Sequence, residues 1–197
     1  MKVTLLHHTP LEIADKAISK CWDKDTDKPK ERMYRVANKY KHSSTIEHIN
    51  YSFDIDGVSR ALLQELSRHR MASLSVKSTR YTLKELKTYD SDVEDFLVPT
   101  GNSYIDSANR LQLATLKWAL KDDVSNDLVK YMLPEAYKTS LVWTINMRSL
   151  QNFLKLRTDK AALWEIRDLA YAVYQKVPDA HKFMLEDYVK EREDEQV

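Results

Sequence analysis

Only two of the 197 residues are glycines, Gly57 and Gly101, and this scarcity limits the chain more than any other feature. Phosphate-binding loops such as GxGxxG and GxxxxGKS/T need several glycines close together, because the backbone must approach the phosphates. Neither loop can form in this chain. If the protein binds a nucleotide, side chains must therefore hold its phosphates.

Length and composition fit one globular domain, residues 1–197. Hydrophobic residues make up 43% and charged residues 31%, and the formal net charge of +1 excludes a protein that coats nucleic acid by bulk charge. The single cysteine, Cys21, excludes a disulfide scaffold, and no His or Glu spacing predicts a metal site. No apolar run reaches the roughly 18 residues of a membrane span. We therefore expect a cytoplasmic protein, with a frayed charged tail at 190–197.

Hydrophobic patterning predicts an α+β fold, a small antiparallel sheet wrapped by helices in a single domain. Strands are expected at 2–6, 47–55 and 139–146, and the last should be buried because it is apolar on both faces. Helices are expected after Thr9-Pro10, where Thr9 should be the cap, and then near 30–40, 58–68, 102–133, 148–155 and 160–176. The segment 71–81 lacks helix caps and should be a loop.

Arginines are the first candidates for a functional site. The segment 68–80, RHRMASLSVKSTR, combines arginines, serines and a histidine with no acidic residue, and such groups can bind phosphate without glycine. His69 lies between two arginines and should have a lowered pKa. Arg148, Arg157 and Arg167 lie among apolar residues, where an arginine must be paired or bind a ligand. Solvated surface arginines are the alternative, and both interpretations stay open on chemistry alone.

Two other functions compete with an anion site. Ser78 has no base beside it in the sequence, so a nucleophilic triad is weakly supported. An extended segment 76–80 would point Ser78 and Arg80 the same way. The alternative from a different class is an RNA- or single-strand-binding module that uses the arginines of residues 60–80. Such a module would bind oligonucleotides with a strong salt dependence.

Several motifs together resemble the flavin-dependent thymidylate synthases. RHR followed by seven residues and a serine (68–78) is similar to the family signature, and Arg80-Tyr81 extends the match. Further segments follow in the family's order: EHINYSF (47–53), YMLP (131–134), NMRSLQNFLKLR (146–157) and AALWEIRDLA (161–170). The resemblance implies a homotetramer with active sites between subunits. It also implies the cofactor FAD and the substrates dUMP, methylenetetrahydrofolate and NADPH, with dUMP methylated to dTMP.

The resemblance further implies roles for single residues. For the FAD region, the implied residues are Arg68, His69, Arg70, Arg157, His48 and Asn50, with His48 where folate enters. For dUMP, they are Gln64, Glu65, Arg68, Ser78, Arg80, Arg148 and Arg167. Arg167 and Ser78 would be the catalytic residues, Arg167 by favouring negative charge on the uracil. Ser78 would act as a ligand, because the family is generally described as needing no enzyme nucleophile. No metal, membrane or nucleic-acid partner is implied.

The chain departs from the family pattern at a few positions. Val76 replaces an acid that many relatives carry, and Lys155 replaces the asparagine of an NLR motif. Lys160 and Ala161 occupy the stretch before WEIR in which many relatives carry a histidine. Glu65 stands where glutamine is usual, with Gln64 one place earlier. These departures concern FAD and dUMP contacts. A catalytically inactive member of the same fold is therefore a second alternative.

Overall fold

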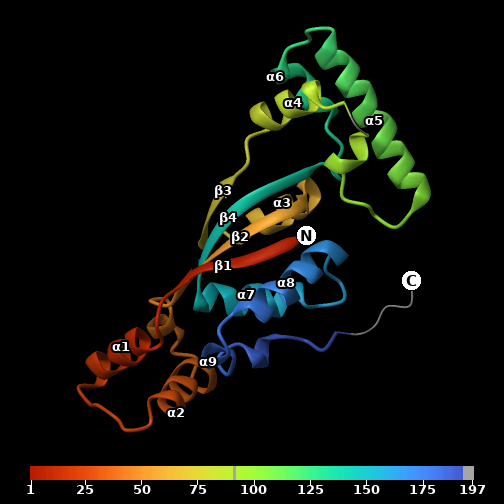
Figure 1. Cartoon of the computed structure of the whole chain (residues 1–197). Helices are drawn as coiled ribbons and strands as arrows, with labels where there is room; N and C mark the ends of the chain where they lie inside the picture. Colours follow the sequence, from red (N-terminus) through yellow and green to blue (C-terminus); the bar gives the residue numbers. More distant parts are fainter. Residues whose placement is uncertain (91, 193–197) are drawn as a thin grey trace.

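The computed structural model describes residues 1–90 and 92–192. Within them, four strands form one antiparallel sheet in the order β1-β2-β4-β3 (Figure 1). Their bounds are Lys2–His8 for β1, Asn50–Ser59 for β2, Ala72–Val76 for β3 and Lys138–Asn146 for β4. The expected α+β fold with a small antiparallel sheet is therefore confirmed.

The sheet buries one face against the C-terminal helices α7 (Met147–Arg157) and α8 (Trp164–Lys176) (Figure 1). Alternate residues of β2 and β4 face this core, because successive side chains of a strand point to opposite faces. Phe53 and Trp143 are fully buried, and the Trp143 ring meets Phe153 of α7 edge-on at 4.9 Å. The expectation that β4 is buried on both faces is wrong. Val142 is 38% exposed, since the opposite face of the sheet is partly open in the single chain.

Helices near the N-terminus pack at the end of β1. They are α1 (Glu12–Trp22), α2 (Pro29–Met33), the π-helix Tyr34–Lys39 and the 3-10 turn Ser43–Ile46. Thr9 does not cap α1, contrary to expectation, because α1 begins later and Leu11 precedes it without a side-chain cap. The Thr9 hydroxyl instead accepts a hydrogen bond from the backbone N–H of Asn50 at 3.2 Å.

The segment 71–81 is not a loop, which corrects the expectation from the sequence. It contains β3, which follows α3 (Arg60–Ser67), and the start of α4 (Thr79–Thr88). α4 is the first element of a helical unit, residues 79–137. The rest of this unit consists of the 3-10 turn Val93–Phe96, α5 (Ser103–Lys121), α6 (Asn126–Val129) and the 3-10 turn Lys130–Met132. Figure 1 shows the unit beyond one end of the sheet, where its leucines form a second hydrophobic cluster.

The C-terminal segment returns to the core through α9 (Asp179–Lys182) and the 3-10 turn Glu186–Tyr188. Within the tail expected to be frayed, 190–197, the Lys190 N–H donates to Thr158 just after α7, and Arg192 donates to Asp168 of α8. Residues 193–197 lie outside the described part. No described helix is both long and apolar enough to cross a membrane.

Candidate functional site

A cleft of about 720 Å³ lies where the turn after α3 meets the C-terminal half of α7 and the loop that follows. We call it the arginine cleft. Its charged lining consists of Arg68, Arg70, Lys155, Arg157, Lys190 and Asp159, and His69 lies among them. Among the described residues, five cations thus line the cleft with one carboxylate, which is the electrostatic pattern of a site for an anionic ligand.

Local structure explains why two distant motifs meet here. α3 ends at Ser67, and the RHR segment then crosses to β3, which pairs with β4. β4 continues directly into α7, whose first turn is capped by Asn146, because its side chain accepts from the Ser149 N–H at 2.8 Å. Strand pairing places Ala72 opposite Ile145 and so brings the end of the RHR segment beside the start of α7, while hydrogen bonds from Arg157 hold His69 and Glu65 against the last turn of α7.

Arg157 is the organising side chain of the arginine cleft. Its Nη1 donates to Glu65 Oε2 at 2.8 Å, its Nη2 to the Glu65 carbonyl at 3.2 Å, and its Nε to His69 Nε2 at 3.0 Å. Arginine is a hydrogen-bond donor only, so His69 Nε2 must accept. The neutral His69 ring therefore carries its proton on Nδ1 and offers an N–H donor.

His69 has a pKa lowered to about 4. Burial is the main cause, the charge of Arg157 adds to it, and Arg68 contributes less, while Glu65 opposes the shift. The expected direction is confirmed, although the main cause is the fold rather than the flanking arginines. Edge-on packing against Phe153, with ring centroids 5.0 Å apart, helps bury the imidazole. At neutral pH the residue is an uncharged donor within a cationic cleft.

Ser78 and Arg80 lie away from this cleft, on the helical unit. Ser78 caps α4, since its hydroxyl accepts from the Arg80 N–H at 3.3 Å. The helix begins at Thr79, so segment 76–80 is not extended throughout and the condition for aligning the two side chains is not met. Arg80 is exposed and lines a separate hollow of about 340 Å³ with Tyr81, Lys84 and Asn126. In the single chain, these two predicted dUMP ligands do not meet the RHR segment.

The remaining predicted residues are also distributed over the surface. Arg148 is 57% exposed and pairs with Glu47 at 2.5 Å, so its expected apolar surroundings are absent. His48 and Asn50 are exposed at the start of β2, where Asn50 Nδ2 donates to the His48 carbonyl at 3.3 Å. Gln64 is exposed and donates to Glu135 Oε2 at 2.9 Å.

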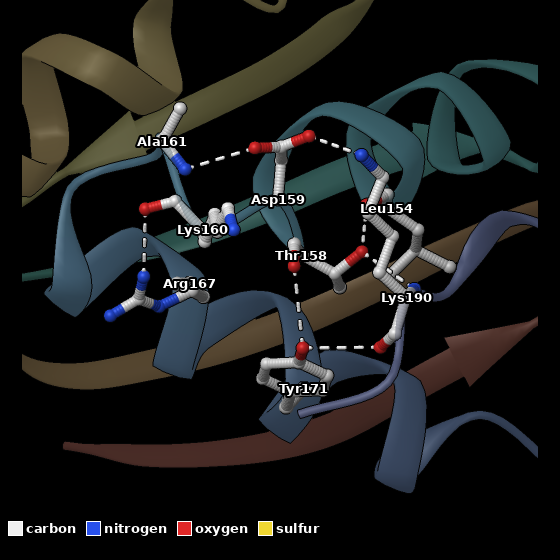
Figure 2. Close-up of polar contacts among 8 residues, drawn as sticks. All are labelled: Leu154, Thr158, Asp159, Lys160, Ala161, Arg167, Tyr171 and Lys190. Atoms are coloured by element: carbon white, nitrogen blue, oxygen red, sulfur yellow. Dashed lines mark hydrogen bonds and ion pairs between the residues drawn. The ribbon is translucent and has the colours of Figure 1, made fainter. Parts of the chain in front are cut away.

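Arg167 lies beside the arginine cleft and does not line it. Its Nη1 donates to the Lys160 carbonyl at 2.9 Å, within the loop between α7 and α8 (Figure 2). Asp159 and Ala161 of this loop do line the cleft. The contact therefore couples Arg167 to one wall of the site.

Sequence reasoning missed five polar residues of the cleft: Ser149, Asn152, Lys155 as a lining residue, Asp159 and Lys190. The three residues on α7 could have been found from helical spacing, because positions 149, 152 and 155 follow one another at intervals of three and lie on one side of the helix. Lys190 carries no local signal, since only the return of the C-terminal segment brings it to the cleft. Among the described residues, no group of three or more His, Cys, Asp or Glu side chains is placed to hold a metal ion.

Comparisons with known proteins identify the family. A family model described as "Thymidylate synthase complementing protein" matches residues 4–181. Flavin-dependent thymidylate synthases of Campylobacter jejuni and Wolinella succinogenes are 50% and 49% identical to the chain, covering 94% and 93% of it and 96% and 97% of the relatives. A thymidylate synthase X structure from Helicobacter pylori, solved with FAD and dUMP, has a TM-score of 0.92 at 46% identity, covering 97% of this chain and 100% of that one. The chain therefore belongs to the flavin-dependent thymidylate synthases.

Proposed function

We propose that this protein is an FAD-dependent thymidylate synthase that methylates dUMP to dTMP. Methylenetetrahydrofolate supplies the carbon, and NADPH supplies the electrons. The observation that carries the proposal is the arginine cleft, in which two motifs that resemble the family's own meet around five cations and a neutral histidine. The enzyme names of the relatives favour this function over a nucleic-acid-binding module.

The donor set of the cleft fits a flavin dinucleotide. Arg68, Arg70 and Arg157 carry permanent positive charge suited to a pyrophosphate, Lys155 adds a basic side chain beside them, and no glycine loop is needed. Neutral His69 adds an N–H donor for the edge of a heterocycle, without further charge. When bound, the flavin supplies the redox chemistry, while the chain positions the reactants and stabilises developing charge.

For dUMP we assign Ser78, Arg80, Gln64, Arg148 and Arg167. Arg80 would bind the phosphate and Arg167 the uracil, with Ser78 as a ligand. In one chain Ser78, Arg80 and Arg148 lie apart from the arginine cleft. This separation supports a homotetramer in which active sites form between subunits.

The surface of α5 supports subunit association as well. Tyr104, Leu111 and Trp118 are 80%, 70% and 69% exposed and recur every seven residues, so they lie on one face of the helix. An exposed apolar stripe of this kind is typical of a surface that another protein covers. A second copy of the chain is the occupant we assign to it, in a cytoplasmic enzyme.

An absorbance spectrum with and without added FAD, followed by an assay of dTMP formation, tests the function. The protein should show a flavin spectrum and form dTMP only when dUMP, methylenetetrahydrofolate and NADPH are all present. Flavin binding without turnover would indicate an inactive member of the fold. Tight, strongly salt-dependent oligonucleotide binding without flavin binding would favour the nucleic-acid alternative.

A further inference from the structure

The C-terminal segment Val189–Arg192, which we call the strap, is fastened to the loop after α7. The Lys190 N–H donates to Thr158 Oγ1 at 3.0 Å, and the Tyr171 hydroxyl donates to the Lys190 carbonyl at 3.1 Å (Figure 2). Thr158 is 2% exposed and its own hydroxyl donates to the Leu154 carbonyl at 2.7 Å. Both polar groups of the Lys190 backbone are thus satisfied by buried or half-buried partners, which fixes the position of this residue.

A second contact holds the strap beyond Lys190. Arg192 Nη2 lies 2.8 Å from Asp168 Oδ1, and its guanidinium lies over the Tyr171 ring at 5.4 Å from the centroid. The Lys190 side chain is consequently placed in the lining of the arginine cleft and is not a free surface lysine.

The Lys190 ammonium has more N–H donors than its carboxylate partner, Asp159, accepts. Its ammonium group pairs with Asp159, which also accepts from the Ala161 N–H at 2.9 Å (Figure 2). An ammonium has three N–H donors, so donors remain for another acceptor. Among the described residues, Asp159 is the one carboxylate in a lining with five cations, and Glu65 pairs with Arg157 from outside the lining. The cleft keeps an excess of positive charge after both carboxylates are counted.

We propose that Lys190 is a binding residue for a phosphoryl group of the nucleotide that occupies the arginine cleft. This inference rests on the proposed function. Lys190 lies beyond residues 4–181, the part that the family model matches, so the C-terminal strap adds this cation to the motif-encoded arginines. The phosphoryl group belongs either to FAD or to dUMP, and binding measurements distinguish the two.

The test uses the full chain with Lys190→Ala, Lys190→Arg and a matched control, Lys87→Ala. Lys87 forms an ion pair with Asp123 at 2.6 Å on the helical unit, and it does not line the arginine cleft. FAD is titrated into the apoprotein by flavin fluorescence, and dUMP is titrated into the FAD-loaded protein. Thermal midpoints are recorded for every variant to check that each one folds. The backbone contacts of residue 190 do not involve its side chain, so all variants should keep them.

Lys190→Ala should weaken one of the two ligands roughly threefold to tenfold, as expected for a half-exposed charge-assisted hydrogen bond. Lys190→Arg should restore most of the affinity, Lys87→Ala should change neither, and added salt should weaken wild type more than Lys190→Ala. A loss for FAD assigns the contact to the pyrophosphate, and a loss for dUMP assigns it to the monophosphate.

Two outcomes overturn the inference in distinguishable ways. If wild type binds both ligands and Lys190→Ala binds each within twofold of it, Lys190 is only a structural partner of Asp159. If wild type binds neither FAD nor dUMP, the proposed function fails and the role of Lys190 fails with it. In the first case, a lower thermal midpoint of Lys190→Ala would be the sign of that structural contact.

Discussion

The pair Glu65–Arg157 is the residue-level feature on which the arginine cleft depends. Arg157 is only 15% exposed and Glu65 32%, so removing one charge leaves the other poorly solvated. Glu65→Gln should lower the free energy of unfolding by about 1–3 kcal/mol. It should also lower the pKa of His69 further, because Glu65 is the group that raises it. Urea denaturation and NMR titration measure the two effects.

Glu94→Gln is the matched control for this variant. Glu94 pairs with Arg110 at 2.5 Å, but both side chains are about half exposed, and such pairs contribute roughly 0–1 kcal/mol. Equal losses in the two variants would show that burial does not strengthen the Glu65–Arg157 pair.

One buried histidine, His181, and one half-buried histidine, His69, predict how stability depends on pH. His69 and His181 have a pKa lowered to about 4, chiefly by burial, from an ordinary value of 6.5. Between these values the unfolded chain binds more protons than the folded one, so stability should fall as pH drops from about 6.5 toward 4. Urea midpoints at pH 7.5 and 5 test this sign. A midpoint that rises on acidification would contradict it.

His181→Gln isolates one of the two contributions. The His181 Nδ1 lies 2.8 Å from the Tyr51 hydroxyl in the core, and a protonated ring could no longer accept from it. The variant should be less stable at pH 7.5 but lose less on acidification than wild type. His42→Gln, the same substitution at an exposed histidine, is the matched control variant.

Arg80 and Arg167 should separate substrate binding from catalysis. The charge of a phosphate is the same before and during reaction, so Arg80→Lys should raise the apparent Michaelis constant for dUMP with less effect on turnover. Arg167→Lys keeps the charge but loses the planar fork, and it should mainly slow oxidation of reduced flavin, by up to about 10²–10³. Stopped-flow flavin oxidation and dUMP binding by fluorescence measure both. Proportional losses in the two variants would refute the division of roles.

At the level of elements, Ser78 has two roles at the start of α4: it caps the helix, and it is a proposed ligand of dUMP. Ser78→Ala removes the helix cap and should cost about 0.5–2 kcal/mol of stability. It should raise the Michaelis constant for dUMP but leave measurable turnover. Ser78→Asp should keep the cap, since Asp is also a good capping residue, yet repel the phosphate. Trapping a covalent Ser78–nucleotide adduct would overturn the assignment of Ser78 as a ligand.

At the scale of the whole molecule, sites shared between subunits should make flavin affinity depend on association. On dilution below the association midpoint, the apparent FAD affinity should fall together with the light-scattering mass. Trp118→Lys, on the exposed face of α5, should shift both transitions to higher protein concentration. A monodisperse monomer that still forms dTMP would refute shared sites.

Sequence alone determined the local and periodic features of this protein. The strand expected at 47–55 overlaps β2, Asn50–Ser59, and the ordered motifs together correctly indicated the family. These features are readable because hydrophobic period and motif order are properties of short segments. The scarcity of glycine likewise indicates, without the fold, that side chains must hold any phosphate that the protein binds.

Tertiary structure alone decided the features that depend on distant partners. β3 has little strand signal of its own and forms because Ala72 and Leu74 pair with Ile145 and Trp143 of β4. His69 owes its lowered pKa mainly to burial and to Arg157, which lies 88 residues away along the chain. Lys190 reaches the cleft because Thr158 and Tyr171 fix its backbone. Such contacts join segments with no common local pattern, so only the folded chain reveals them.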